Sequence, residues 1–272
     1  MAGYLNSQGV SRSTLTTTLL NTLDLGDSLN PTLIDTVPGV AEVVDSLEGL
    51  PVEPPSIYID LEGVNLSRIG TISILQVYIH TTKQVYLIDV LTLRDKCFST
   101  CGESGRTLKD IFESSTIPKV FFDVRNDSDA LYHHFQINLA GVLDLQLMEL
   151  ATRNSNRRLV SGLSKCIERD APLSATERRS WMQIKDKGVQ LFNPENGGSY
   201  AVFNERPLRE DISLYCTQDV QILPRLWAHY SSKITPAWKL RVNSVSKERV
   251  EQSQSPSYNG KGRHMALAPA GW

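Results

Sequence analysis

Two short segments of this chain carry acidic side chains at spacings that suit metal chemistry. Asp60 and Glu62 are two apart in a run rich in β-forming residues, so a strand would direct both carboxylates to one face of a sheet. Tyr215 and Asp219 are four apart in a segment with helical periodicity, which would place them one turn apart on one helix face. Carboxylates gathered without histidine or cysteine favour a hard cation, Mg²⁺ or Mn²⁺, and such ions usually act on phosphates.

Both segments also have simpler structural explanations. The strand pair fits the solvated face of an edge strand, and the helix pair fits a half-buried contact between a tyrosine and an aspartate. Gly63 directly follows Glu62 and argues against the first explanation, because a glycine lets a ligand or another backbone approach closely.

A third acidic segment surrounds Asp127, which lies between Asp123 and Asp129. Taken alone, Asn126 or Asp127 fits the N-cap of a helix, because an apolar-periodic run follows. The segment by itself therefore leaves a capping role and a chemical role open.

The elements that must position these side chains are a strand-rich first half and a more helical second half. Strands are predicted over 56–62, 72–80, 84–90, 119–124 and 142–144, and 32–36 fits a further short strand. Helices are predicted over 38–50, 108–112, 127–135, 145–152 and 208–230, with the last broken or kinked at Pro224. This order predicts a mixed sheet with helices on both faces. The Gly-rich turns of 170–206 predict an insertion or loop with a small hairpin.

The three acidic segments together resemble the DEDD superfamily of 3′–5′ exonucleases, in the subgroup whose last motif is Tyr-x-x-x-Asp. The matching positions are Asp60 with Glu62, Asp127 with Leu131 and Phe135, and Tyr215 with Asp219. Asp127 is preferred over its neighbour Asp129, because Leu131 then falls at the plus-four position of the family's second motif. Within the superfamily, the run over 60–68 and 74–76 resembles the RNase D-like group and, within it, the eukaryotic branch that includes Egalitarian.

The resemblance implies an α/β, RNase H-like fold: a mixed five-stranded sheet with three initial antiparallel strands and helices on both faces. It also implies that Asp144 and Gln76 support the site from behind. The exonuclease domain would span 31–232, with 170–206 as its insertion. Residues 1–30 would form a flexible arm, and 233–272 a basic, flexible tail.

The activity implied by the resemblance is two-metal hydrolysis of single-stranded nucleic acid from its 3′ end, with RNA favoured over DNA and nucleoside 5′-monophosphates as products. Asp60, Glu62, Asp127 and Asp219 would hold two Mg²⁺ or Mn²⁺ ions. Tyr215 would orient the attacking water, because a phenol near its ordinary pKa is a poor base. The alternative is a catalytically weak RNA-binding adaptor on the same fold.

Charge along the chain is uneven, and the second half is the basic one. Residues 151–190 carry nine bases against four acids, whereas residues 1–59 carry one base against seven acids. Basic side chains proposed to contact phosphates are Arg178, Arg179, Lys185 and Lys187. Trp181 and Phe192 are proposed to stack on bases, although such residues more often belong to a core. For each single basic residue, a solvated helix face is the simpler interpretation.

The remaining sequence features concern location. No apolar run reaches the roughly 20 residues that span a membrane, so a membrane partner is not expected. The N-terminus lacks the pattern of a secretory or mitochondrial signal, and the four cysteines contain no CxxC pair. We therefore expect an intracellular protein, cytoplasmic or nuclear, and no motif indicates a protein partner.

Overall fold

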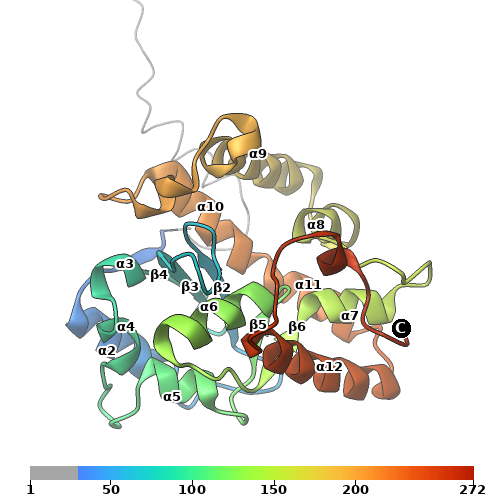
Figure 1. The fold of residues 1–272 in the computed structure, drawn as a ribbon, viewed down its shortest axis with the longest axis horizontal. Helices are drawn as coiled ribbons and strands as arrows, with labels where there is room; N and C mark the ends of the chain where they lie inside the picture. Colours follow the sequence, from blue (N-terminus) through green and yellow to red (C-terminus); the bar gives the residue numbers. More distant parts are fainter. Residues whose placement is uncertain (1–29) are drawn as a thin grey trace, which may run out of the picture.

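The computed structural model describes residues 30–272, and a six-stranded mixed sheet lies at their centre (Figure 1). Its strands are β1 (Thr32–Ile34), β2 (Ile57–Glu62), β3 (Ile74–Ile79), β4 (Gln84–Ile88), β5 (Lys119–Phe121) and β6 (Val142–Asp144), in the spatial order β1-β4-β3-β2-β5-β6. β2, β3 and β4 form an antiparallel meander, and β1, β5 and β6 each pair in parallel with a neighbour. The predicted α/β fold is confirmed, and β1 brings the predicted five strands to six.

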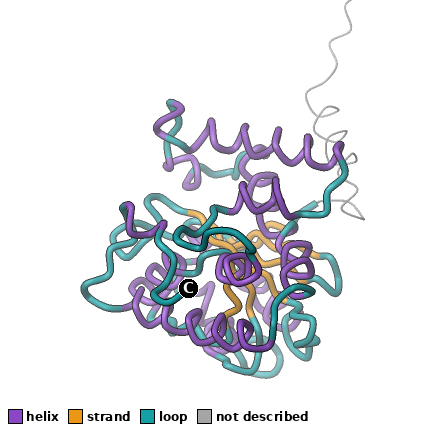
Figure 2. Tube along the Cα trace, turned by 90° about the vertical axis from the view of Figure 1, so that its right-hand side faces the viewer, coloured by secondary structure: helices purple, strands orange, loops and turns teal. Residues whose placement is uncertain are grey.

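Helices cover both faces of this sheet (Figure 2). They are α2 (Val37–Ser46), α3 (Val90–Leu93), α4 (Lys96–Ser99), α5 (Leu108–Glu113), α6 (Arg125–Phe135), α7 (Leu145–Thr152), α8 (Leu163–Asp170), α9 (Ala175–Phe192), α10 (Glu210–Gln221), α11 (Leu223–Ser231) and α12 (Pro236–Gln254). Short 3₁₀ turns occur at Pro194–Asn196, Tyr200–Asn204 and Arg263–Ala266. Among residues 30–272, no helix combines the length and the apolar content needed to cross a membrane.

Two hydrophobic cores form, one on each face of the sheet, because side chains alternate along the strands. On one face, Ile57 and Ile59 of β2 pack with apolar residues of α2, α5 and α6. On the other face, Tyr58 packs with apolar residues of α7, α10 and α11. Asp60 and Glu62 follow the same alternation as Tyr58, so β2 directs both carboxylates toward α10.

The segment 170–206 differs from the predicted loop with a small hairpin, because its largest element is the 18-residue helix α9. Ser174 and Glu177 form a complete capping box at the start of this helix, in which each side chain accepts a hydrogen bond from the other residue's backbone N–H. Gly188 lies inside the helix rather than in a turn. α9 packs along α10 at the outer edge of the fold (Figure 1).

The segment 233–272, predicted as a flexible tail, contains helix α12 packed against α6, β6 and α7. α12 buries Val242, Val245 and Val250 in the cores, and it also docks through polar contacts. Arg249 is 4% exposed and donates to Asp144 Oδ2 at 2.6 Å. Arg68 donates to the backbone carbonyls of Ser253 and Ser255 at 2.8 Å. Buried polar contacts of this kind leave no apolar stripe in the sequence. The predicted arm over 1–30 lies outside the described residues, apart from Asn30.

One ion pair ties the connection before α10 to the sheet. Arg206 donates through Nε and Nη2 to both carboxylate oxygens of Asp89, at 2.6 Å each. It also donates to the Phe203 carbonyl at 2.9 Å. Burial alone would raise the pKa of Asp89, but hydrogen bonds from Arg206 and Thr92 outweigh it and hold that pKa below its ordinary value.

We therefore expect Arg206→Met to lower the free energy of unfolding by about 2–4 kcal/mol at pH 7, because it leaves a buried carboxylate uncompensated. A lowered pKa stabilises the fold above about pH 4, and this stabilisation is lost as the pH falls through the folded-state pKa. The decrease in unfolding free energy caused by Arg206→Met should therefore be smaller below about pH 4. Urea unfolding at several pH values measures this, with Arg209→Met as the control, because Arg209 pairs only with the exposed Glu205. Equal losses in the two variants would contradict the assignment.

Candidate metal and active site

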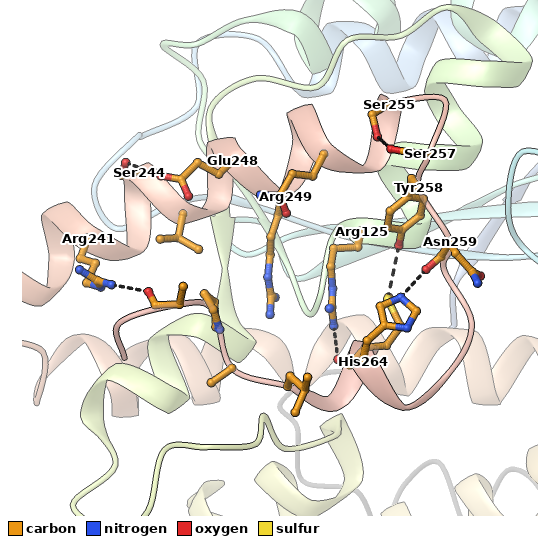
Figure 3. Close-up of a pocket in the computed structure, with 17 residues that line it drawn as sticks. Arg125, Arg241, Ser244, Glu248, Arg249, Ser255, Ser257, Tyr258, Asn259 and His264 are labelled. Atoms are coloured by element: carbon orange, nitrogen blue, oxygen red, sulfur yellow. Dashed lines mark hydrogen bonds between the residues drawn. The ribbon is translucent and has the colours of Figure 1, made fainter.

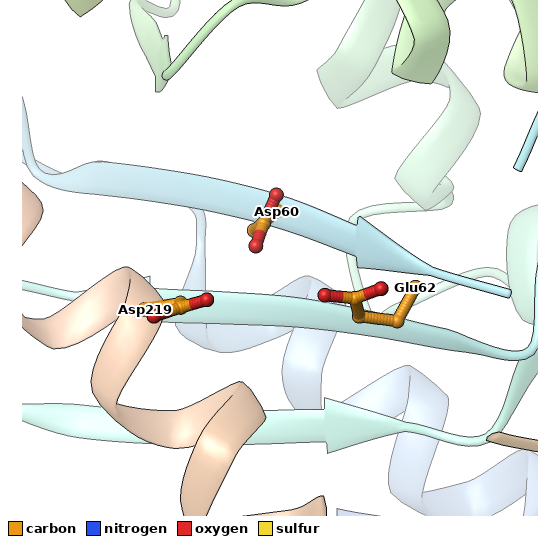
Figure 4. A group of neighbouring side chains, drawn as sticks. All are labelled: Asp60, Glu62 and Asp219. Carbon is orange, nitrogen blue, oxygen red and sulfur yellow. The ribbon is translucent and has the colours of Figure 1, made fainter. Parts of the chain in front are cut away.

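Three carboxylates meet where β2 faces α10 (Figure 4). Asp60, Glu62 and Asp219 each offer an oxygen atom, and these atoms all lie within 4.8 Å of one another. Asp60 and Glu62 come from β2, and α10 brings Asp219 across the sheet to them. The grouping expected from the sequence is therefore present for these three side chains.

α10 positions Tyr215 in the same group, one helical turn before Asp219. Hydrogen bonding with the phenol of Tyr215 lowers the pKa of the Glu62 carboxylate, although burial and the neighbouring negative charges raise it more. Burial raises the pKa of this phenol well above its ordinary value, and the negative charges of Glu62, Asp219 and Asp60 raise it further. Tyr215 therefore keeps its proton at neutral pH and acts as a hydrogen-bond donor rather than a base.

Asp127 lies in the first turn of α6, is 6% exposed, and does not belong to the group of three. Burial raises its pKa well above the ordinary value, and the charges of Asp60, Asp123 and Glu62 add to the shift. Asp127 is therefore close enough to Asp60 and Glu62 for their charges to act on it, although it lies outside the group of three. It does not cap α6, because the helix begins at Arg125 without a side-chain cap.

Asp129, the competing residue in this segment, has a structural partner instead. Its carboxylate accepts from Arg68 Nε at 2.7 Å and from the Arg68 backbone N–H at 2.8 Å. The contact ties the loop after β2 to α6. The structure therefore favours Asp127 over Asp129 as the carboxylate directed at the cluster.

Burial, with electrostatic repulsion added to it, disfavours the charged forms of these acids. Burial raises the pKa of Asp60 to about 7, and the charge of Asp219 contributes to the shift. Burial also raises the pKa of Glu62 well above its ordinary value, with Asp60 and Asp219 adding to the effect. Within residues 30–272, the buried Oδ1 of Asp219 has no hydrogen-bond partner. Several closely spaced oxygens, including one unpartnered atom, fit a divalent cation of the hard class.

The two predicted supporting residues, Asp144 and Gln76, lie in different surroundings. Asp144 is fully buried and accepts from the backbone N–H groups of Asp123 and Gln146 at 3.0 Å each, so it holds the turn that leads into α6. Gln76 of β3 pairs with Asp60 in the sheet register, and its side-chain amide is buried without a hydrogen-bond partner. Directly opposite residues share a face, so this amide faces α10 with Asp60.

The four basic residues that were predicted to contact phosphates lie in different environments. Arg178 donates to the carbonyls of Ile167 and Glu168 and so closes the C-terminal end of α8. Arg179 and Lys187 are exposed on α9, and Lys187 lies 3.9 Å from a carboxylate oxygen of Asp211. Lys185 is different, because its ammonium group lies inside the candidate site.

The two aromatic side chains proposed to stack on bases are packed within the protein. Trp181 is 3% exposed and belongs to the core on the α10 side of the sheet. Phe192 is half-buried, with its ring centroid 5.1 Å from that of Tyr215 and 5.4 Å from that of Phe203. The stacking prediction does not fit Trp181, and Phe192 supports the ring of Tyr215.

Lys185 and Gly188 are the site residues whose roles the sequence did not indicate. Lys185 donates to Asp219 Oδ2 at 2.6 Å and to Tyr215 Oη at 3.2 Å. Gly188 lies so close to Tyr215 that a Cβ atom would come within 2.4 Å of the ring. The sequence does contain a pattern that predicts α9. Ser174 and Glu177 match a capping box, and Trp181, Lys185 and Gly188 then follow the i, i+4, i+7 spacing of one helix face.

A separate pocket of about 600 Å³ lies between α12 and the segment that follows it (Figure 3). Arg125 and Arg249 line it, and each is already paired: Arg125 with Asp123 at 2.5 Å and Arg249 with Asp144 at 2.6 Å. None of the clustered acids lines this pocket. We assign the candidate site to the carboxylates, because Lys185 balances only part of their negative charge, whereas each arginine is paired with its own carboxylate.

Comparison with known proteins agrees with the resemblance seen in the sequence. A family model described as 3′–5′ exonuclease matches residues 31–235. The structure of Trypanosoma brucei RNase D in complex with GMP is 26% identical, with a TM-score of 0.69 over 86% of this chain and 68% of that chain. A structure of Trypanosoma brucei RNase D with RNA U12 is 23% identical, with a TM-score of 0.69 over 93% and 80%, and supports the fold.

One curated relative is similar over a shorter region. The piRNA biogenesis protein EXD1 of Bombyx mori is 29% identical over 161 residues, which are 53% of this chain and 47% of that protein. The chain therefore spans about half the length of this relative. Together the matches confirm the predicted resemblance to RNase D-like exonucleases, and the position near Egalitarian stays a prediction.

The contact between Gly188 and Tyr215 gives a direct test of how α9 supports the site. Gly188→Ala should lower the free energy of unfolding by about 1–2 kcal/mol, although alanine is the better helix former, because the methyl group must displace the ring. Urea unfolding measures the change. Gln190→Ala is the control, because Gln190 is exposed on the same helix and its truncation should be nearly neutral. A more stable Gly188→Ala would show that helix propensity outweighs the contact.

Proposed function

Since the chain belongs to the 3′–5′ exonuclease family, we propose that it removes nucleotides from the 3′ end of single-stranded nucleic acid, RNA in preference to DNA, and releases nucleoside 5′-monophosphates. The observation that carries the proposal is the convergence of Asp60, Glu62 and Asp219 beside a protonated Tyr215. Within an exonuclease family, that combination is suited to hydrolysis of a terminal phosphodiester.

Asp60, Glu62 and Asp219, with Asp127 beside them, would hold Mg²⁺ or Mn²⁺. When bound, such ions supply the positive charge that activates a water molecule and stabilises the leaving oxygen. Two features of the site support this assignment: the burial and mutual repulsion that raise the pKa values of Asp60 and Glu62, and the Oδ1 atom of Asp219, which has no partner among the described residues.

The protein's own contribution is to orient the reactants. Tyr215 Oη keeps its proton and can donate a hydrogen bond to the attacking water, which orients the water without removing its proton. Phe192 and Gly188 pack against the Tyr215 ring from two sides and limit its freedom. Asp144 holds the turn before α6 and thereby the position of Asp127.

The proposed preference for RNA rests on the similarity of this chain to a solved RNase D structure. The 26%-identical RNase D structure is a complex with GMP, a ribonucleoside monophosphate. A ribonucleotide bound to a relative of the same fold supports an RNA substrate and a monophosphate product for this chain. Discrimination against DNA would require contacts to the ribose 2′-hydroxyl.

One observation favours a second function, an RNA-binding adaptor with little turnover. The Lys185 ammonium lies 2.6 Å from Asp219 Oδ2, so a carboxylate that the enzyme needs for metal is already ion-paired. If that pair persisted in the presence of metal, the fold would bind nucleic acid without cutting it. The same assay separates the two functions.

The test uses the full chain with 5′-labelled single-stranded RNA and DNA of one sequence, in Mg²⁺ or Mn²⁺ and in EDTA. We expect a ladder that shortens from the 3′ end, faster on RNA, and absent in EDTA. Asp60→Ala should slow it at least about a thousandfold, because members of a catalytic group act as a unit. Asp186→Ala, which removes an exposed acid from α9, is the control and should cut at the wild-type rate.

The possible results distinguish the proposals. Mass spectrometry should identify nucleoside 5′-monophosphates as products. Retarded migration of the RNA on a native gel without any ladder would favour the adaptor. Cleavage that persists at full rate in Asp60→Ala would refute the site assignment.

A further inference from the structure

Lys185 has a position that the exonuclease reaction does not require. It lies on α9, outside the strand and helices that carry the clustered acids, and its side chain is 15% exposed. In the orientation that satisfies both its neighbours, the buried Gln218 amide accepts from the Lys185 backbone N–H at 3.1 Å and donates to the Trp181 carbonyl at 3.2 Å. The backbone of α9 is thereby fixed to α10 beside the site.

The ammonium group of Lys185 is held by three contacts. It donates to Asp219 Oδ2 at 2.6 Å and to Tyr215 Oη at 3.2 Å. It also lies 4.4 Å from the centroid of the Tyr215 ring, within the range of a cation–π interaction. A primary ammonium group with three donors is well suited to this arrangement of carboxylate, phenol and ring face.

The charge of Lys185 acts on the whole cluster. It is the cation that lowers the pKa values of both Asp60 and Glu62, against burial and mutual repulsion. Burial disfavours the Lys185 ammonium itself, but the charge and hydrogen bond of Asp219 outweigh burial and raise its pKa. The lysine thus supplies part of the positive charge that the three carboxylates need.

A divalent ion would need the same carboxylate. Asp219 Oδ2 is committed to Lys185, and two cations on one carboxylate repel each other at short range. The lysine stem is flexible, and its partial exposure gives the ammonium a way to solvent. A divalent ion on the free Oδ1 of Asp219 would lie close to the ammonium group, so repulsion between the two cations opposes metal binding unless the ammonium moves away.

We propose that Lys185 is an internal cation that competes with the divalent ion for Asp219, and so raises the metal concentration at which the site fills. The inference rests on the proposed function, because it assumes that Asp219 binds metal. It makes Lys185 a positioning residue that keeps the carboxylates together between metal-binding events. Loss of its charge should strengthen metal binding.

The experiment measures Mn²⁺ binding directly, by electron paramagnetic resonance or calorimetry, on the full chain at pH 7 without nucleic acid. Lys185→Met keeps much of the stem and removes the charge, and we expect it to bind Mn²⁺ about tenfold more tightly, a typical coupling between two ligands. Lys187→Met is the matched control. It removes the same charge two residues along α9, from an exposed side chain, and should bind like wild type.

A second variant and a stability measurement keep the test decisive. Lys185→Gln can still donate to Asp219 without a charge, so it too should bind Mn²⁺ more tightly. Thermal unfolding in EDTA reports whether each variant is folded. Folded Lys185→Met and Lys185→Gln with wild-type or weaker Mn²⁺ affinity would overturn the inference and leave the proposed function intact. Absence of Mn²⁺ binding in wild type and all variants would overturn both.

Discussion

Repulsion among carboxylates on one buried sheet face is the constraint on which the rest of this site depends. Side-chain alternation in β2 sends Asp60 and Glu62 toward α10, on the same face as the fully buried Tyr58. Asp219 arrives on that face from α10, so negative charges are concentrated where little water can screen them. Such an arrangement is stable only with positive charge nearby, from a metal ion, a lysine or both. The raised pKa values of Asp60 and Glu62 result from their burial and from the neighbouring negative charges.

The surrounding structure fixes the acids through a layer of buried polar contacts rather than by apolar packing alone. Arg249 of α12 pairs with Asp144, which in turn holds the turn before α6 and therefore Asp127. Arg206 pairs with Asp89 and ties the connection before α10 to the sheet. These contacts anchor the segments that lead into α6 and α10, the helices that carry Asp127 and Asp219. The rigidity of the site thus depends on elements distant in sequence, including the C-terminal helix.

Much of the fold could be predicted from the sequence, because its strands and several helices have strong local patterns. The antiparallel meander, the strand at 142–144 and the helix at 145–152 agree with the structure closely. The two largest differences, α9 and α12, have a physical reason. Both helices are polar over much of their surface. The buried apolar face of α9 is narrow, and α12 docks through buried valines together with polar contacts such as the Arg249–Asp144 pair.

The sequence by itself determined which acids share a face, because the periods of strand and helix follow from backbone geometry. It therefore predicted that Asp60 would accompany Glu62 and that Tyr215 would accompany Asp219. Only the tertiary structure decided that Lys185, 34 residues from Asp219 in sequence, would reach the same carboxylate. The reason is that such a contact depends on how α9 packs against α10, and that packing is set by the combined burial of many side chains rather than by any local spacing.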